Sequence, residues 1–482
     1  MSFNSIDFAI FFPLVFVVYW YIFGSNLRWQ NAFLVVVSYI FYGWWDYRFL
    51  VLILISTLTD YIIGLQLYKQ KEKLPKKLLL FLSIAMNIGI LGFFKYFHFF
   101  VDSFISAFSL FGYTIHTSSL DIILPVGISF YTFQTLSYTI DIYRNRIRPT
   151  SDVVAFSAFI SFFPQLVAGP IERAGHLLPQ FLKERSFDYA LAVTGCRQIL
   201  WGLFKKMVIA DNCAVIADEV FKHHAEYPGS SVILGVFFFS IQIYCDFSGY
   251  SDIGIGISKL LGFNLKNNFL YPYFSKNIIE FWQRWHISLS TWFRDYVYIP
   301  LGGNRVNNLQ WMTNILIVFV LSGLWHGANW NFIIWGLSHA ILYLLISTNF
   351  WTNSDKLLVS HISESKIWVT LKIFSTFMSV ALLWVLFRAV DIRQAMGIYE
   401  KIFSQSVFDF PKFQSYGLVV TTSILIAVCM VIEWLGRYNN FAIENLFVGQ
   451  NKWLRWSFYS ILVACISMYM QAGGSPFIYF QF

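Results

Sequence analysis

A histidine interrupts one of the most apolar stretches of the chain. His326 follows apolar residues at positions 315–324 and precedes another apolar run at 332–346. Its near neighbours supply aromatic walls and amide groups: Trp325, Asn329, Trp330 and Asn331. An imidazole at membrane depth is costly to keep without a partner or a chemical role. Its proton affinity suits general-base catalysis, and the natural reaction removes a proton from a hydroxyl that attacks a thioester or ester carbonyl.

The backbone around this histidine is expected to allow close approach. Gly323 and Gly327 lack a Cβ, so another chain segment or a ligand can come near. The Asn329 amide is a candidate partner that would orient the imidazole of His326. His339 also lies in an apolar run, but it has no unusual polar neighbour except Ser338, and we expect it to be a satisfied core residue.

Two further polar stretches interrupt apolar runs. Residues 242–252 place Asp246 and Asp252 at the end of one run, and residues 163–173 contain prolines and a glycine. Irregular backbone at membrane depth is tolerated where it lines a cavity or is buried by protein. An ordinary capped helix end would explain each stretch equally well.

Other catalytic signatures are absent from the sequence. The chain has no serine nucleophile elbow, P-loop or HExxH motif. Its five cysteines are far apart and lack metal-ligand spacing, so we expect neither a disulfide framework nor a metal site. Any chemistry must therefore be built from histidine, asparagine, hydroxyl and backbone groups.

The composition is that of a polytopic membrane protein. Of the 482 residues, 57% are hydrophobic and 12% are charged, whereas soluble domains carry roughly twice that charged fraction. The net charge of +8 is concentrated in a few connections, which favours positive-inside topology over nucleic-acid binding. The basic connections are 69–77, 144–148 and Lys205 with Lys206. Placing them in the cytoplasm puts the N-terminus outside.

Apolar runs of spanning length recur along the whole chain and predict about eleven membrane helices. The candidates are about 6–23, 30–45, 48–68, 77–98, 121–142, 190–210, 231–247, 311–325 with 328–347, 367–390, 416–436 and 453–472. Shorter runs at 99–112 and 152–168 are expected to be re-entrant or interfacial. We find no internal repeat and no long polar linker, so residues 1–482 are expected to form one all-α membrane domain.

The segment 264–308 is more polar and rich in aromatic residues. Residues 278–296 are consistent with one amphipathic helix, in which Glu280 would pair with Arg284. Its apolar stripe would be Phe281, Trp285, Leu289 and Trp292, facing Arg284, Ser288, Thr291 and Asp295. Such helices lie at the membrane interface, where this one could be a peripheral anchor without chemistry.

Taken together, these motifs resemble the membrane-bound O-acyltransferase (MBOAT) family, and within it the branch of alginate and peptidoglycan O-acetyltransferases. The resemblance covers most of the chain and is densest in residues 125–134, 163–173, 246–252, 281–303 and 325–327. A signature region at about 125–345 would be followed by C-terminal helices at about 367–472. Motifs of this length and order are highly specific.

The resemblance implies a ring of helices around a central tunnel. His326 matches the family's catalytic histidine, and His286 matches a second signature position that is often Asn or Asp in other branches. His286 would line the cytoplasmic mouth or polarise the thioester carbonyl. We expect further contributions to substrate binding from Asn329, Trp325, Arg284, Arg294, Asp246 and Gln134.

The implied reaction takes an acetyl group from a cytoplasmic thioester, acetyl-CoA or another, towards an extracytoplasmic polysaccharide. Acetyl-CoA would be a substrate, and no bound cofactor is expected. The chain has no segment like an SGNH hydrolase, so a separate extracytoplasmic acetyltransferase of that type is the expected partner. The expected setting is a bacterial cytoplasmic membrane, in contact with lipids and without nucleic acid.

Two alternatives remain open. D-alanyl transfer to teichoic acid is the nearest rival within the family, and the sequence Gly-Ala-Asn-Trp-Asn after His326 favours the acetyltransferase branch over it. A transporter or export subunit would use intramembrane polar groups as a substrate path. The absence of repeats and of a carboxylate relay argues against this second alternative.

Overall fold

The computed structural model describes residues 1–111, 120, 122–125, 127–166, 169–347, 365–471 and 477–478. These residues form helices joined by turns and loops, and they contain no strand. Contacts divide the chain into two compact units. The first contains Met1–Gly195 and Ile257–Lys266, and the second contains Cys196–Gly256 and Asn267–Phe482.

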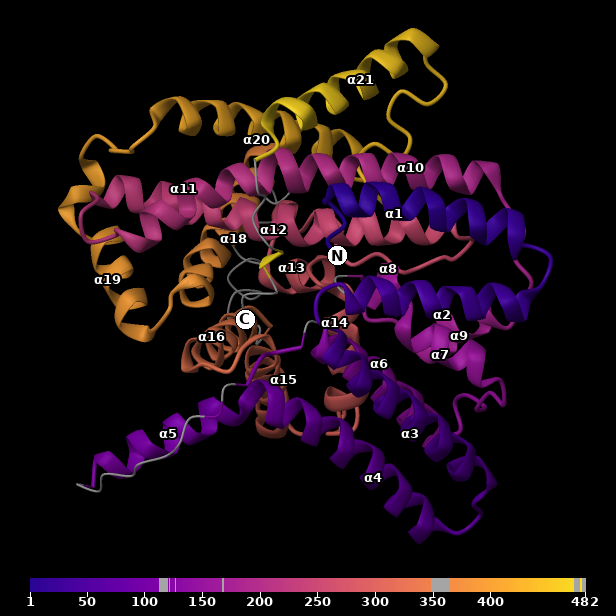
Figure 1. The fold of residues 1–482 in the computed structure, drawn as a ribbon. Coiled ribbons are helices and arrows are strands. Elements are labelled where there is room, and N and C mark those ends of the chain that lie inside the picture. The colour runs from indigo at the N-terminus through magenta and orange to yellow at the C-terminus, as the bar shows by residue number, and fades with distance from the viewer. Residues whose placement is uncertain are drawn as a thin grey trace. The chain divides into compact units, whose positions relative to one another are not determined.

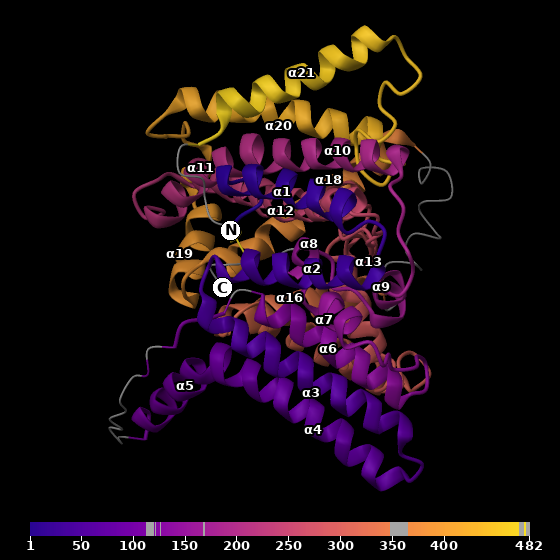
Figure 2. The same ribbon diagram turned by 45° about the vertical axis from the view of Figure 1, so that its right-hand side comes forward.

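The first unit holds the helices up to the start of α10 (Figures 1 and 2). They are α1 (Ile6–Val17), α2 (Leu27–Gly43), α3 (Leu50–Lys69), α4 (Lys73–Leu91), α5 (Phe97–Ser109), α6 (Ile128–Tyr143), α7 (Val153–Ser161), α8 (Phe163–Leu166) and α9 (Ala174–Phe181), with short π and 3-10 turns between some of them. Side-chain caps start several of these helices, as where Asp152 accepts from the backbone of Val154 and Ala155.

A hydrogen-bonded polar core joins α3, α4 and α6, which pack against one another. The Asp60 carboxylate on α3 accepts hydrogen bonds from Ser83 (2.6 Å) and Asn87 (2.8 Å) on α4. On α6, Thr135 donates to the Asn87 side chain, and Thr139 accepts from Ser83. Because each buried polar group has a partner here, the cost of burying them is offset.

The backbone is broken next to the stretch 163–173, which was expected to interrupt an apolar run. Helix α7 ends at Ser161, Phe162 is not helical, and α8 follows as a single turn. Phe162, Phe163 and Gln165 are fully buried, so irregular backbone here is covered by protein, as the membrane environment requires. Positions 167–168 lie outside the described residues.

The second unit contains the remaining helices. They are most of α10 (Tyr189–Leu203) and α12 (Gly229–Leu260), together with α11 (Asp211–Lys222), α13 (Ile278–Arg284), α14 (Ile287–Phe293), α15 (Asn308–His326), α16 (Trp330–Ser347), α18 (Lys366–Arg388), α19 (Ile392–Ile402), α20 (Tyr416–Gly436) and α21 (Lys452–Tyr469). A π-helical segment, Phe204–Ala210, connects α10 to α11.

The single amphipathic helix predicted over 278–296 is wrong. Helix α13 ends at Arg284, and α14 begins only at Ile287, because His286 adopts a left-handed conformation between them. The predicted apolar stripe is buried inside the protein, with Trp285 fully covered, so it does not lie on a membrane surface. The predicted Glu280–Arg284 ion pair is confirmed, at 2.6 Å.

Seven helical segments among the described residues are long and apolar enough to cross a membrane. They are Tyr47–Lys69, Lys73–Ser109, Gly229–Leu260, Asn308–His326, Trp330–Ser347, Lys366–Arg388 and Tyr416–Gly436. Shorter apolar helices lie at Ile6–Ile22 and Val153–Leu166. The sequence-based set of about eleven also counted shorter helices, such as α6 with 16 residues and α10 with 15. The chain is an all-α, multi-pass membrane protein.

Candidate active site

Close packing of α15 on α16 sets the position of His326. Helix α15 ends at His326, and α16 begins four residues later. A Cβ added to Gly323 would lie 2.1 Å from the backbone oxygen of Phe332, and one added to Gly336 would lie 2.3 Å from that of Phe319. Small residues on both helices therefore permit a backbone contact that any side chain would prevent. The close approach expected at Gly323 is confirmed.

Aromatic rings surround the imidazole of His326, which is 2% exposed. The ring centroids of Trp325, Trp335 and Phe387 lie 5.0, 5.2 and 5.3 Å from its own, all in edge-to-face arrangements. A site walled by rings excludes water, which strengthens electrostatic interactions inside it. The expectation of aromatic walls holds for Trp325, to which the structure adds Trp335 and Phe387, whereas the expected wall residue Trp330 is 52% exposed.

His286 lies in the same place. Its ring centroid is 6.4 Å from that of His326 and 5.8 Å from that of Trp325, and the residue is fully buried. On the side of α12, Phe247 packs edge-to-face against it at 4.7 Å. We call His286, His326 and the rings of Trp325, Trp335 and Phe387 the histidine centre.

The backbone of His286 is unusual. It has φ 42° and ψ 54°, in the left-handed region that few non-glycine residues occupy. Such a conformation costs on the order of 1–3 kcal/mol and persists only where the surroundings impose it. It turns the chain sharply between α13 and α14, and it brings the imidazole to His326.

Burial also sets the charge of this side chain. Desolvation lowers the pKa of His286 to about 3, because an imidazolium without water around it is unfavourable. The ring is therefore neutral at physiological pH. A neutral ring keeps one unprotonated nitrogen, so it can accept a proton or a hydrogen bond.

His339 is buried in the core, as predicted, and it belongs to the wall of the same site, but among the described residues it is not the satisfied residue that was expected. It is fully buried, and its centroid lies 4.8 Å from that of Trp335 and 5.0 Å from that of Trp282. Among the described residues neither of its ring nitrogens has a hydrogen-bond partner. The sequence does indicate this position: Trp335 and His339 are four residues apart, so they share one face of α16.

Asn329 does not occupy the position predicted for it. Its amide nitrogen donates to the backbone oxygen of Val390 at 3.0 Å, and its amide oxygen accepts from the backbone of Asn331 at 3.1 Å. Both ends of the amide are thus used to cap the start of α16 and to hold the end of α18. The expected role as the partner that orients His326 is wrong.

Three other predicted side chains have structural partners. Arg284 pairs with Glu280, and Arg294 bonds the adjacent Asp295 at 2.9 Å. Arg294 remains 59% exposed at its side chain. Gln134, in the first unit, is buried and donates to the backbone oxygen of Phe159 at 2.7 Å.

A buried ionic cluster, which sequence reasoning missed, lies in the second unit. Lys206 pairs with Asp211 and Asp246 at 2.8 Å each, and Asp246 also accepts from the backbone of Ile478 at 2.7 Å. Lys205 pairs with Asp252 at 2.7 Å. Both lysines are at most 3% exposed, so their assignment to a cytoplasmic loop is wrong, and Asp246 is placed in an ion pair.

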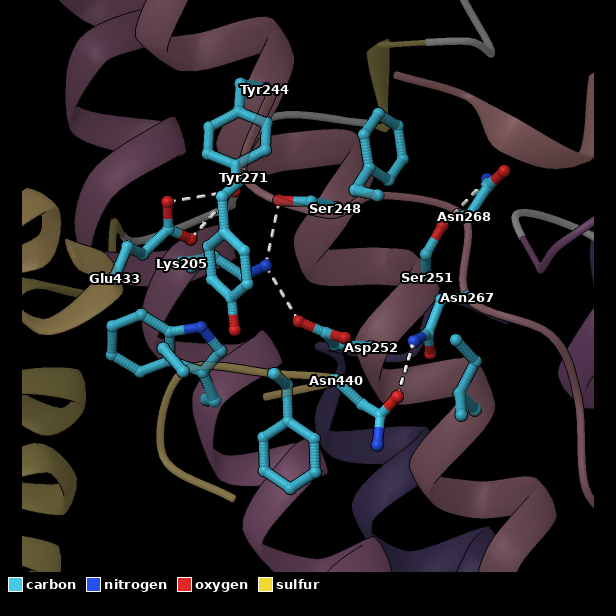
Figure 3. A pocket seen from close by; sticks show the side chains of 15 residues that line it. Lys205, Tyr244, Ser248, Ser251, Asp252, Asn267, Asn268, Tyr271, Glu433 and Asn440 are labelled. Carbon is cyan, nitrogen blue, oxygen red and sulfur yellow. Dashed lines mark hydrogen bonds and ion pairs between the residues drawn. The ribbon is translucent and has the colours of Figure 1, made fainter. Parts of the chain in front are cut away.

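Polar side chains extend this cluster around a small cavity of about 10 Å³ (Figure 3). Lys205 also donates to Ser248 at 2.9 Å, and Tyr244 donates to both oxygens of Glu433 at 2.8 and 2.9 Å. We call Lys205, Lys206, Asp211, Asp246, Asp252 and Glu433 the ionic cluster. A cavity of this size holds at most about one water molecule. No group of three metal-ligating side chains occurs within the described part of the chain.

Comparison with known proteins places these residues in a family. The model of MBOAT, the membrane-bound O-acyltransferase family, matches residues 49–354, which include both histidines of the centre. A probable alginate O-acetylase of Pseudomonas aeruginosa is 37% identical over 445 residues, covering 91% of this chain and 82% of the relative. A peptidoglycan O-acetyltransferase of Helicobacter pylori is 35% identical over 416 residues, covering 80% and 77%.

A third relative is more distant. The teichoic acid D-alanyltransferase of Bacillus subtilis is 32% identical over 240 residues, covering 47% of this chain and 60% of the relative. The acetyltransferases thus match along much more of the chain. With a buried histidine pair inside the matched region, the chain is a membrane O-acyltransferase that belongs to the MBOAT family.

Proposed function

We propose that the protein transfers an acetyl group from a cytoplasmic thioester, acetyl-CoA, towards an extracytoplasmic polysaccharide such as alginate or peptidoglycan. The observation that carries this proposal is the histidine centre: two buried imidazoles, 6.4 Å apart between centroids, inside a wall of aromatic rings. The extent of the match to the two O-acetyltransferase relatives supports acetyl as the transferred group.

In the proposed reaction His326 is the general base. Its imidazole takes the proton of the attacking hydroxyl while the hydroxyl oxygen bonds to the thioester carbonyl carbon. The tetrahedral intermediate then collapses, the carbon–sulfur bond breaks, and the imidazolium returns the proton to the departing thiolate. No net proton is consumed. A base of this kind contributes about 10²–10⁴-fold, and positioning within the dry site supplies more.

The setting follows from the same reasoning. We place the protein in the bacterial cytoplasmic membrane with its N-terminus outside, since basic residues at 69–77 and 144–148 still favour a cytoplasmic position. The burial of Lys205 and Lys206 removes the third basic connection from that argument. The acceptor hydroxyl would belong to a separate SGNH-hydrolase-like partner, which then acetylates the polysaccharide.

D-alanyl transfer is the second candidate, and the similarity to a teichoic acid D-alanyltransferase favours it specifically. The two functions differ in their donor. An acetyltransferase consumes acetyl-CoA, and a D-alanyltransferase consumes an aminoacyl thioester on a carrier protein.

The test uses purified protein in nanodiscs with radiolabelled acetyl-CoA, comparing wild type with His326→Ala. We expect wild type to release coenzyme A, with label moving to an acceptor, and we expect His326→Ala to lose at least about 100-fold of that rate. His223→Ala is the matched control, because His223 lies on a surface turn, with 40% of its side chain exposed.

Two outcomes would overturn the proposal. If acetyl-CoA stays intact while a D-alanyl carrier thioester is consumed, the second candidate is correct. If a folded His326→Ala protein turns over acetyl-CoA as fast as wild type, His326 is not the base.

A further inference from the structure

Asn268 connects the histidine centre to the ionic cluster. It lies in the loop between α12 and α13, is 1% exposed, and also lines the small cavity of Figure 3. Its amide oxygen is 3.0 Å from Nδ1 of His286 and 2.9 Å from the hydroxyl of Ser288. Its amide nitrogen donates to Ser251 on α12 at 3.2 Å, as the dashed line in Figure 3 shows.

The backbone of Ser288 fixes which end of this amide faces His286. The Ser288 N–H points at the Asn268 side-chain oxygen at 3.4 Å. A backbone N–H is always a donor, so the atom that it faces must be the amide oxygen and not the amide nitrogen. Flipping the amide would place two N–H groups against each other.

The orientation of the amide determines the tautomer of His286. An amide oxygen only accepts, so Nδ1 of His286 must carry the hydrogen that lies between them. In a neutral ring the second nitrogen, Nε2, is then unprotonated. Because the two nitrogens of an imidazole point in diverging directions, Nε2 faces away from Asn268.

Asn268 also holds the backbone that presents this ring. Its main-chain oxygen accepts from the N–H of Ile287 at 2.9 Å, and its side chain accepts from that of Ser288. These are the first two N–H groups of α14, which a helix leaves without internal partners. Asn268, which lies 20 residues before Ser288 in the chain, thus caps α14 and stabilises the left-handed turn at His286.

From this geometry we infer that Asn268 is a positioning residue that fixes His286 as the Nδ1–H tautomer, so that His286 acts on substrate as a hydrogen-bond acceptor through Nε2. This inference deepens the proposed acetyl transfer. It rests on that proposed function, because the substrate meant here is a substrate of acetyl transfer. It also replaces the expected role of His286 as a group that polarises the thioester carbonyl with a different proposed role. Polarising a carbonyl oxygen requires a hydrogen-bond donor, and Nε2 of this tautomer carries no hydrogen to donate. His286 instead accepts from a proton-bearing group of a substrate other than the attacking hydroxyl, whose single proton goes to His326.

The tautomer is tested first, without reference to activity. Nitrogen-15 spectra of histidine-labelled protein in nanodiscs distinguish protonated from unprotonated ring nitrogens, and the His286 signals are those missing in His286→Ala. We expect a protonated Nδ1 and an unprotonated Nε2 at neutral pH. A protonated Nε2 would overturn the inference, even in a protein that transfers acetyl groups.

The second test changes Asn268. Asn268→Leu removes the acceptor at similar size, and we expect kcat to fall at least about 10-fold with little change in KM for the donor. Asn267→Leu is the matched control, because the neighbouring Asn267 bonds Asn440 at the surface instead of a histidine. An equal loss of kcat in both variants, or no loss in a folded Asn268→Leu protein, would overturn the inference.

Asn268→Asp guards against simple misfolding. A carboxylate still accepts from both His286 and Ser288, so we expect it to retain much of the activity that Asn268→Leu loses. Its negative charge also stabilises an imidazolium, so the acidic limb of its pH–rate profile should move to higher pH. His326 lies on one side of this ring, and Asn268 itself lines the cavity together with the charged side chains of Lys205, Asp252 and Glu433.

A profile identical to that of wild type would mean that the side chain at 268 does not act through His286, and it would overturn the inference. If wild type does not use acetyl-CoA at all, the proposed function fails, while the nitrogen spectra still decide the tautomer.

Discussion

The ionic cluster and the histidine centre are both buried in the second unit, but they satisfy their polar groups differently. In the ionic cluster each lysine lies between oxygen atoms at hydrogen-bonding distance, as Lys206 does between Asp211 and Asp246. In the histidine centre the neighbours of His326 are mainly ring edges and faces. Opposite charges held together in this way resist rearrangement. A neutral imidazole keeps one unprotonated nitrogen, which can accept a proton or a hydrogen bond. We therefore assign a structural role to the ionic cluster and the catalytic role to the histidine centre.

The largest effect should follow from removing the central charge of the ionic cluster. Lys206→Met leaves Asp211 and Asp246 buried without their cation, so we expect a loss of about 3–5 kcal/mol in the free energy of unfolding. Thermal unfolding and the yield of monodisperse protein measure it, with the exposed Lys183→Met as control.

A triple variant sharpens this prediction. Lys206→Met combined with Asp211→Leu and Asp246→Leu removes all the charges together and should recover much of the lost stability. If the triple variant is less stable than Lys206→Met, unpaired buried charge is not the cause of the stability lost in Lys206→Met.

A variant at Glu433 separates stability from chemistry within the ionic cluster. In Glu433→Gln the amide oxygen still accepts from Tyr244, so we expect stability to change by no more than about 1 kcal/mol. The rate of acetyl transfer by the folded protein should stay within about twofold of wild type. A loss of rate comparable to that of His326→Ala would place Glu433 in the chemistry and break the distinction.

Acid should destabilise the histidine centre specifically. Because burial lowers the pKa of His286 to about 3, the unfolded chain binds a proton at His286 below pH ~6.5 while the folded chain does not. Stability should therefore fall as pH drops from about 6.5 towards 3, by up to about 1.4 kcal/mol per pH unit from this group. Melting temperatures of wild type and His286→Asn should converge as the pH is lowered. Parallel curves would contradict the stated cause.

The smallest effect is expected at the surface arginines. Arg294→Ala removes an exposed pair with Asp295, so stability should change by less than about 1 kcal/mol. If Arg294 meets donor phosphates, KM for acetyl-CoA should rise several-fold at unchanged kcat, and added salt should shrink the difference. Arg284→Ala is the matched comparison, since the guanidinium of Arg284 is engaged by Glu280.

The sequence was informative where a local pattern is sufficient. Hydropathy predicts the long helices, and an imidazole in an apolar run next to Gly323 points to His326 without any tertiary information. The close approach of α16 follows from the same glycine. These features depend on residues that are neighbours along the chain, so the sequence displays them directly.

Features that depend on distant residues could not be predicted in this way. The apolar spacing of Phe281, Trp285 and Leu289 continues across the break at His286, so this spacing predicts one unbroken helix. The residue that stabilises the break is Asn268, which lies in the loop before α13 and leaves no mark on that spacing. A basic pair such as Lys205 and Lys206 resembles a cytoplasmic connection unless Asp246 and Asp252 are known to face it from α12.

The left-handed backbone at His286 limits which amino acids can evolve at that position. Besides glycine, asparagine, aspartate and histidine adopt this conformation most readily, whereas β-branched residues are strongly disfavoured. Asn and Asp are also the residues that the family resemblance gives for other branches, and both offer an oxygen acceptor. In a saturation library at position 286, folded protein should therefore be recovered mainly with these few residues. The left-handed backbone at position 286 would thus restrict which variants fold, before any selection for activity.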